Sequence, residues 1–347
     1  MVPAAALAAE LIKRGHRVAL VSDARGVRFP GLFEDVQTHV IPAGRFAGGP
    51  IGWLKAAKAM WEGRAMALQL YSTFKPAAVI GFGGYPAFPA LSAAFKAGIP
   101  TAVHEQNAVL GRVNRLGAGK VDAIATSYPD TQRLPDKYKA KTRLIGNPVR
   151  EAVLKLRGEP YPELDGDGLF RVLVTGGSQG ASILSKVVPD GLSLLPVAFR
   201  RRLQVTHQAR IEDIDAVRAK YAELGIAADL ATYIADMPAE LAWAHLVIAR
   251  AGASTIAELT AAGRPAILVP LPSATDDHQT ANAREIVTAG GARSIPQPQF
   301  TAVELAKQIQ KLGLDPKALE NAAARAKSCG RPDAVTDLAD LVEGLAK

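Results

Sequence analysis

The sequence predicts an α/β fold built from two doubly wound, Rossmann-like halves. Short β-branched runs alternate with Ala-rich helical stretches along the chain, which is typical of parallel strands joined by helical crossovers. The chain has 347 residues, and because one domain usually takes roughly 100 to 200 residues, we expect two domains. Ligands in such folds bind at the carboxyl ends of the strands, so we expect a cleft between the halves.

The first half is predicted to begin with a helix, because Pro3 suits a first turn, residues 4–14 favour helix and Gly15 suits the helix end. The second half instead begins with a strand and a glycine-rich turn. If the two halves are analogous, we expect a strand and a glycine-rich turn to be missing ahead of Met1. The expected strands are residues 17–23, 77–81, 101–104 and 123–127 in the first half, and 171–175, 203–207, 246–249 and 266–270 in the second.

We expect residues 1–149 to form the first domain and residues 150–332 the second. A C-terminal helix, residues 333–347, is expected to pack back on the first domain.

Composition excludes several classes of protein. With 48% hydrophobic and 21% charged residues the chain can bury a core, and Cys329 alone forms no disulfide framework. Apolar runs such as residues 265–272 are far shorter than the roughly 20 residues of a membrane span. The net charge of +8 favours anionic partners. No zinc-ligand spacing or RNA-binding aromatic motif is present, so nucleic acid is not expected as a partner.

The strongest single motif is RVLVTGGSQGA at residues 171–181, a buried strand followed by glycines and Ser178 and then a helix. Glycines allow close approach of the backbone, and a helix N-terminus offers free N–H groups to a phosphate. A tight turn without a ligand is the alternative. NAD is disfavoured, because the next strand ends in His207-Gln208 rather than in the acidic residue that binds a ribose.

A second strand leads into RAGASTIAE at residues 250–258. Ser254 and Thr255 can cap the helix that starts there, and Glu258 can accept two hydrogen bonds from a ribose diol. Alternatively, Thr255 and Glu258 form a capping box, with Glu258 only closing the helix.

A polar cluster follows the strand at residues 266–270. Its members are Asp276, Asp277, His278, Gln279 and Asn282. The consecutive carboxylates and imidazole lack the spacing of metal ligands, so we expect no metal. Gln279 and Asn282 suit sugar hydroxyls, and ordinary loop polarity is the alternative.

Three features of the first half also follow strands or lie at its end. His104, in HEQN at residues 104–107, is the histidine best positioned for acid-base chemistry, although a histidine at a strand end more often has a structural role. GFGGYP at residues 81–86 is expected to face the cleft. Arg150 can clamp a pyrophosphate or form an ion pair between the domains.

Residues 51–74 carry aromatic and basic side chains near helical spacing, namely Trp53, Lys55, Lys58, Trp61 and Arg64. This pattern fits a helix lying on an anionic membrane. A stripe of core residues is the alternative.

Six motifs occur in one order along nearly the whole chain. They are GFGGYPA at 81–87, HEQN at 104–107, GNPVR at 146–150, GGSQGA at 176–181, RAGASTIAE at 250–258 and DHQTANA at 277–283. In this the sequence resembles the MurG family, which transfers N-acetylglucosamine (GlcNAc) from UDP-GlcNAc to lipid I, undecaprenyl-pyrophosphoryl-MurNAc-pentapeptide, to give lipid II.

The resemblance implies a GT-B fold that binds UDP-GlcNAc mainly through the second domain, at the cytoplasmic face of the bacterial inner membrane. It implies no cofactor, and lipid I, the anionic membrane surface and other cell-wall and division proteins as partners. The substrate-binding residues that it implies are Asn107, Arg150, Ser178, Ile234, Ala253, Ser254, Thr255, Ile256, Glu258 and Gln279. The implied mechanism is an inverting attack of the acceptor C4 hydroxyl on the donor's anomeric carbon.

The family begins with a strand and a GGTGGH-like loop, whose histidine is a candidate base. This sequence starts after that loop, so we expect either residues encoded upstream of Met1 or an inactive product. The catalytic base is therefore unassigned, with His104 as the substitute. A UDP-sugar-binding module with impaired catalysis and a UDP-GlcNAc epimerase of the same fold are the alternative functions.

Overall fold

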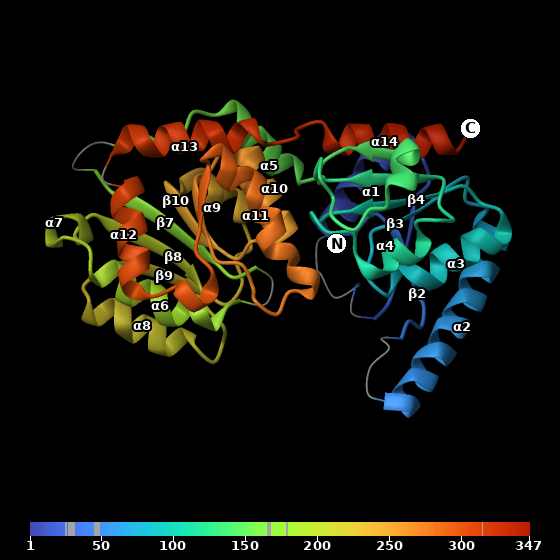
Figure 1. Ribbon diagram of the computed structural model, residues 1–347, viewed down its shortest axis with the longest axis horizontal. Helices are drawn as coiled ribbons and strands as arrows, with labels where there is room; N and C mark the ends of the chain where they lie inside the picture. The colour runs from blue at the N-terminus through green and yellow to red at the C-terminus, as the bar shows by residue number, and fades with distance from the viewer. Residues whose placement is uncertain (25, 27–31, 45–48, 165–167, 178–179, 314) are drawn as a thin grey trace. The chain divides into compact units, whose positions relative to one another are not determined.

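The computed structural model describes residues 1–24, 26, 32–44, 49–164, 168–177, 180–313 and 315–347. The chain divides into two compact units (Figure 1). Unit 1 comprises Met1–Arg150 and Pro332–Lys347, and unit 2 comprises Glu151–Arg331. Both consist of parallel strands and helices, which confirms the predicted α/β class.

Unit 1 contains two parallel sheets. The first pairs β1 (Ala19–Ser22) with β2 (Gln37–Val40), and the second has the order β3 (Val79–Gly81), β4 (Thr101–Glu105), β5 (Ala123–Thr126) and β6 (Thr142–Leu144). The helices are α1 (Val2–Lys13), α2 (Gly49–Phe74), α3 (Ala87–Ala97), α4 (Arg112–Gly117) and α14 (Ala334–Leu345), with a 3-10 turn at Asp136–Lys141.

The C-terminal helix α14 lies along α1 (Figure 1). Leu7 and Leu11 of α1 share a buried cluster with Leu338 of α14. At its edge, Arg14 donates hydrogen bonds to Asp340 and Glu343, at 2.5 and 3.0 Å. Residues more than 300 positions apart in the sequence therefore build one core.

Unit 2 contains one six-stranded parallel sheet. Its order is β12 (Ala292–Ser294), β11 (Ala266–Leu268), β10 (Leu246–Ala249), β7 (Phe170–Thr175), β8 (Leu203–Gln208) and β9 (Ala227–Ala231). The helices are α5 (Glu151–Lys155), α6 (Ser182–Ser193), α7 (Val197–Arg200), α8 (Ile214–Glu223), α9 (Met237–Trp243), α10 (Ala253–Ala262), α11 (His278–Ala289), α12 (Ala302–Gly313) and α13 (Pro316–Ser328). Short 3-10 turns cover Leu156–Gly158, Thr275–Asp277 and Gln297–Gln299.

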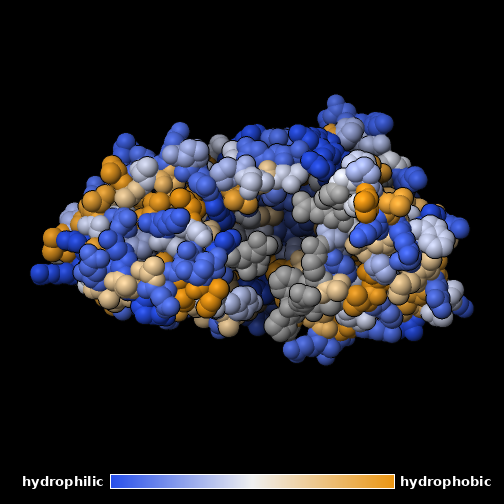
Figure 2. Space-filling model, turned by 90° about the horizontal axis from the view of Figure 1, so that it is seen from below, coloured by the Kyte–Doolittle hydropathy of each residue, from blue (hydrophilic) through white to orange (hydrophobic). Residues whose placement is uncertain are grey.

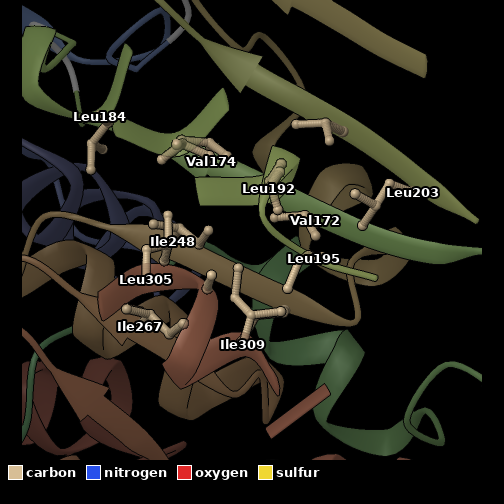
Figure 3. Packing of buried hydrophobic residues seen from close by; sticks show 14 of the residues in the cluster. Val172, Val174, Leu184, Leu192, Leu195, Leu203, Ile248, Ile267, Leu305 and Ile309 are labelled. Carbon is tan, nitrogen blue, oxygen red and sulfur yellow. The ribbon is translucent and has the colours of Figure 1, made fainter. Parts of the chain in front are cut away.

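The core of unit 2 packs α6 and α12 against the central strands (Figure 3). Val172 and Val174 of β7 and Ile248 of β10 are fully buried there, beside Leu184 and Leu305 from the two helices. Central parallel strands are covered on both faces, which is why they are continuous apolar runs in the sequence.

Each predicted strand coincides with an observed one, and the ends agree within two residues. Four further strands, β2, β6, β9 and β12, were not predicted. All four lie at an outer end of their sheet and are largely exposed. An exposed edge strand does not need the apolar run that identifies a central strand.

Candidate functional site

The turn after β7 presents backbone at the carboxyl edge of the unit 2 sheet. At Gly176 a Cβ atom would lie 2.4 Å from the Ala181 nitrogen, so the turn has no room for a side chain. The Thr175 hydroxyl accepts a hydrogen bond from the Gly177 N–H at 3.2 Å and donates to Gln208 Oε1 at 2.8 Å. Ser178 lies outside the described residues, and its contact with a substrate stays a prediction.

Gln208 is a positioning residue that the sequence analysis did not identify. It is buried at the end of β8, and its Nε2 donates to the Thr232 carbonyl at 3.4 Å. Together with the Thr175 bond, this links the glycine turn after β7 to the loop after β9, which contains the predicted Ile234. Ile234 is itself buried. The sequence did contain a signal for this role, because Gln208 ends a buried strand. A buried side-chain amide needs hydrogen-bond partners for both its oxygen and its nitrogen.

Helix α10 starts at the carboxyl end of β10 with an uncapped N-terminus. Its N-cap is Gly252, with φ −66° and ψ 147°, and this glycine has no side chain that could accept a hydrogen bond from the first turn. The first turn therefore presents backbone N–H groups and the positive end of the helix dipole. The predicted residues Ala253, Ser254, Thr255 and Ile256 form this turn.

The capping-box alternative for Glu258 is wrong. A capping box requires Thr255 at the N-cap, whereas the helix begins three residues earlier, at Gly252. Ser254 and Thr255 likewise do not cap the helix. Thr255 and Glu258 are three residues apart within α10, so they lie on one helix face. Glu258 is half-buried there.

Helix α11 holds the polar cluster close to the start of α10. The buried Asn282 donates from Nδ2 to the Ala251 carbonyl at 3.3 Å, directly before the N-cap. Gln279 accepts from the Leu271 N–H at 3.0 Å through Oε1, which fixes the loop after β11. Its Nε2 makes no hydrogen bond to the described part of the chain and remains able to donate to a ligand.

Arg250, just before α10, fixes the same loop. Its guanidinium donates to the carbonyls of Val269 and Pro270, at 3.0 and 3.2 Å, and to Gln297 Oε1 at 2.6 Å. Within the described residues, no cluster of three or more His, Cys, Asp or Glu side chains has the arrangement of a metal site.

In unit 1 the carboxyl edge of the sheet is organised by Glu105, to which the sequence analysis assigned no role. The buried carboxylate accepts hydrogen bonds from the Asn107 backbone at 3.0 Å and side chain at 3.1 Å, from the Gly111 N–H at 2.7 Å and from Asn114 Nδ2 at 2.8 Å. Asn114 also faces Gly83, where a Cβ atom would lie 3.3 Å from Nδ2. The predicted Asn107 is thus held by Glu105 near the Gly83 turn.

The geometry around His104 favours a structural role. The ring is fully buried, Nε2 lies 2.8 Å from the Gly146 carbonyl and Nδ1 lies 2.9 Å from Gln106 Nε2. Burial lowers the pKa of His104 to about 4, although the bond to Gly146 raises it. With both nitrogens occupied and the ring neutral at pH 7, we do not assign His104 as the base.

The loop after β6 carries two further polar residues. Asn147 is buried, and neither polar atom of its amide has a hydrogen-bond partner in the described structure. Such a side chain is a candidate for ligand binding, because an unsatisfied buried amide is costly. The predicted Arg150 is the last residue of this segment of unit 1 and is half-buried.

Helix α2 contradicts the interpretation of its aromatic stripe as core. Trp53 is 59% exposed and Trp61 is 71% exposed, with Lys55 and Lys58 exposed beside them. The buried residues of α2 are Ala56, Gly63, Ala67 and Tyr71. Arg64, the fifth residue of the stripe, is half-buried. Figure 2 views the side toward which α2 extends in Figure 1, and hydrophobic and hydrophilic residues alternate on that surface.

Comparison with known proteins gives a consistent result. The family model described as glycosyltransferase family 28 N-terminal domain matches residues 1–126, and the one described as glycosyltransferase family 28 C-terminal domain matches residues 171–338. A relative from Zymomonas mobilis subsp. mobilis is 64% identical over 99% of this chain and 89% of its own length. It is named UDP-N-acetylglucosamine--N-acetylmuramyl-(pentapeptide) pyrophosphoryl-undecaprenol N-acetylglucosamine transferase. A relative of the same name from Novosphingobium aromaticivorans is 63% identical over 99% of this chain and 88% of its own length.

Solved structures agree with the sequence relatives. The crystal structure of Acinetobacter baumannii MurG matches with a TM-score of 0.78 and 28% identity, over 99% of this chain and 95% of that one. A UDP-GlcNAc 2-epimerase from Neisseria meningitidis matches with a TM-score of 0.68 and 14% identity, over 99% and 96%. At that identity the second match shows a shared fold alone.

Proposed function

Because the chain belongs to glycosyltransferase family 28 and, within it, to the MurG family of N-acetylglucosaminyltransferases, we propose that it transfers GlcNAc from UDP-GlcNAc to lipid I to give lipid II. The observation that carries this proposal is the 64% identity over 99% of the chain to a relative of that name. The epimerase alternative rests on likeness of fold at 14% identity and is disfavoured.

The donor is proposed to bind unit 2 at the start of α10. The uncapped first turn, residues 253–256, suits the diphosphate, because its N–H groups and the helix dipole both favour negative charge. Glu258 is proposed to accept hydrogen bonds from the ribose diol, and the buried Ile234 to contact the uracil. The Gln279 amide nitrogen is proposed to donate to a GlcNAc hydroxyl.

The same groups supply the catalytic electrostatics. The acceptor C4 oxygen attacks the anomeric carbon and gives up its proton to a general base. The bond between the anomeric carbon and the UDP oxygen breaks, so negative charge develops on UDP. N–H groups already oriented at the diphosphate stabilise that charge without reorganisation, which is commonly the largest single catalytic contribution. Arg150 and Ser178 are proposed to face the diphosphate, and Asn107 to contact substrate from unit 1.

The protein is further proposed to bind the cytoplasmic face of the inner membrane through α2. No helix in the described ranges is long and apolar enough to cross a bilayer. The exposed Trp53 and Trp61 would enter the interface, while Lys55 and Lys58 would meet anionic headgroups.

The reaction is tested by incubating the chain with UDP-GlcNAc and a lipid I analogue. Formation of the disaccharide product supports the proposal. UDP-GlcNAc binding without transfer would indicate a sugar-binding module, and release of ManNAc or UDP-ManNAc an epimerase.

Glu258→Gln tests the donor site separately. We expect its Kd for UDP-GlcNAc, measured by calorimetry, to rise about 10- to 100-fold, because hydrogen bonds to a charged group contribute about 1.5–3 kcal/mol. The matched control is Glu320→Gln on the exposed surface of α13, which should bind normally. Unchanged donor affinity in Glu258→Gln would contradict the assignment.

A further inference from the structure

Helix α2 is fixed to unit 1 along its C-terminal part. Gly63 has no room for a side chain, because the Pro42 carbonyl and the ring of Pro89 on α3 lie against it. The Tyr71 hydroxyl donates a hydrogen bond to the Ala90 carbonyl of α3 at 3.1 Å. This part of α2 is therefore packed closely on α3 and on the loop after β2.

The N-terminal end of α2 projects away from the other elements of unit 1 (Figure 1). Residues 49–55, which we call the α2 tip, are exposed or half-buried, and the first buried residue of the helix is Ala56. Three large apolar side chains lie in the tip: Ile51 is 73% exposed, Trp53 59% and Leu54 75%. Apolar side chains gathered in one exposed segment mark an interaction surface.

The apolar side chains of the α2 tip lie on two different rows of the helix. Trp53 lies three residues before Ala56 and so continues the buried row toward the N-terminus. Ile51 and Leu54 lie on another row, which continues at a spacing of four to the exposed Lys58. A helix that lies flat on a bilayer immerses one face and would leave one of these rows in water. Insertion of the α2 tip end-on immerses both rows.

The charges on α2 favour the same orientation. The exposed Lys55 and Lys58 lie at the end of the apolar segment, and Lys58 Nζ is 3.7 Å from Glu62 Oε1. Glu62 follows Lys58 on the row of Leu54, so a helix lying flat on this row would press a carboxylate against anionic headgroups. If the tip enters first, the lysines meet the headgroups. Glu62 then stays in water, because it lies about 12 Å farther along the axis than Leu54.

We propose that α2 enters the surface of an anionic bilayer tip first, with the three apolar side chains of the α2 tip below the headgroups and Lys55 and Lys58 among them. The inference rests on the proposed membrane attachment and adds the orientation of the helix. Trp61 is about 12 Å from Trp53 along the helix axis. Since interfacial helices penetrate about 5–10 Å into the boundary between headgroups and acyl chains, Trp61 lies at the outer edge of the headgroup layer.

Depth-dependent quenching of tryptophan fluorescence tests this orientation. The chain has three tryptophans. One full-length variant, Trp61→Phe with Trp243→Phe, keeps only Trp53, and a second, Trp53→Phe with Trp243→Phe, keeps only Trp61. Both are bound to anionic vesicles whose lipids carry bromine either near the headgroups or deep in the acyl chains. We expect deep bromine to quench Trp53 more strongly than Trp61, and shallow bromine to quench Trp61 more strongly than deep bromine does. Equal depths, or a deeper Trp61, would overturn the proposal.

A matched pair of substitutions on α2 gives a second test. We expect Leu54→Ser in the α2 tip to weaken partitioning onto anionic vesicles about tenfold, because a large apolar side chain no longer leaves water. Met66→Ser replaces an exposed apolar residue in the middle of the helix and should leave partitioning unchanged. Equal losses in both variants would contradict insertion by the tip. If the unmodified chain did not bind the vesicles, the membrane attachment itself would fail, whereas binding with Trp53 and Trp61 at one depth would contradict only the orientation.

Discussion

Glu105 illustrates how a single buried side chain organises a site. Its carboxylate accepts hydrogen bonds from Asn107, Gly111 and Asn114. Three or more donors converging on one carboxylate satisfy a charge that would otherwise be costly to bury. The sequence motif HEQN indicated a site, but the residue that fixes the loop geometry is the one to which no role was assigned.

His104 and His207 predict a loss of stability in mild acid. Burial lowers the pKa of each imidazole to about 4, below the value of about 6.5 expected in the unfolded chain. The unfolded state therefore binds protons below pH 6.5 that the folded state does not. The contribution of each neutral histidine to the free energy of unfolding is fully present above pH 6.5. It is lost as the pH drops toward 4, by about 3 kcal/mol for each histidine.

Urea denaturation at pH 7 and pH 5 measures this effect. We expect His104→Gln to reduce the fall in the free energy of unfolding between these pH values by about 2 kcal/mol. His278→Gln serves as the control, since the ring of His278 contacts the nearby Thr275 carbonyl at an exposed position, and this substitution should leave the fall unchanged. An identical pH dependence in His104→Gln and the unmodified chain would refute the prediction.

At the scale of elements, the uncapped start of α10 predicts that a change which stabilises this helix end weakens the proposed donor binding. Gly252 has N-cap geometry, and a Cβ atom there would meet only Thr255 Oγ1, at 3.7 Å. Gly252→Ser therefore fits and adds a side chain that caps the first turn, stabilising the helix by a few tenths of a kcal/mol. Because that cap competes for the N–H groups proposed to bind the diphosphate, we expect at least tenfold weaker UDP-GlcNAc binding.

Calorimetry measures the affinity for UDP-GlcNAc, and thermal melting of the same samples measures the stability. Gly344→Ser, at a position on α14 where a Cβ atom meets nothing, is the control for an added hydroxymethyl group. Donor binding as tight in Gly252→Ser as in the control would show that the diphosphate does not use this turn.

Helix α2 carries the second prediction at this scale. Replacing both Trp53 and Trp61 with Ser should reduce partitioning onto anionic vesicles at least tenfold, because two exposed aromatic side chains no longer enter the interface. The control is Leu116→Ser, which removes an equally exposed hydrophobic residue of unit 1 that lies off α2 (71% exposed). Sedimentation with vesicles measures the partitioning of both variants. An equal loss of partitioning in both would show that vesicle binding depends on any exposed hydrophobic residue and not on α2.

The elements also show what sequence can reveal. The central strands were predictable because their apolar runs record burial on both faces, as in β7 and β10. The edge strands β2 and β9 were not, because exposed strands carry mixed residues. Whether Glu258 caps a helix or faces a ligand depended on where α10 begins, and helix ends are the least predictable feature of a sequence. The role of Gln208 depends on partners distant in sequence.

At the scale of the whole molecule, the two units have separate cores that can be destabilised independently. Leu338 of α14 is fully buried in unit 1, and Leu319 of α13, only 19 positions earlier, is fully buried in unit 2. Truncation of either to Ala should cost about 2–5 kcal/mol, because each leaves a cavity. In differential scanning calorimetry, we expect Leu338→Ala and Leu319→Ala to lower the midpoint temperatures of two different unfolding transitions.

Donor binding identifies the transitions. If UDP-GlcNAc binds mainly to unit 2, saturating donor raises the midpoint temperature of the transition that Leu319→Ala lowers, since a ligand stabilises only the unit that binds it. The midpoint of the transition lowered by Leu338→Ala should rise less. Should donor raise the Leu338 transition instead, the donor site would belong to unit 1. A single transition lowered equally by both substitutions would show that the two cores unfold together, so that α14 couples the stability of the units as well as completing unit 1.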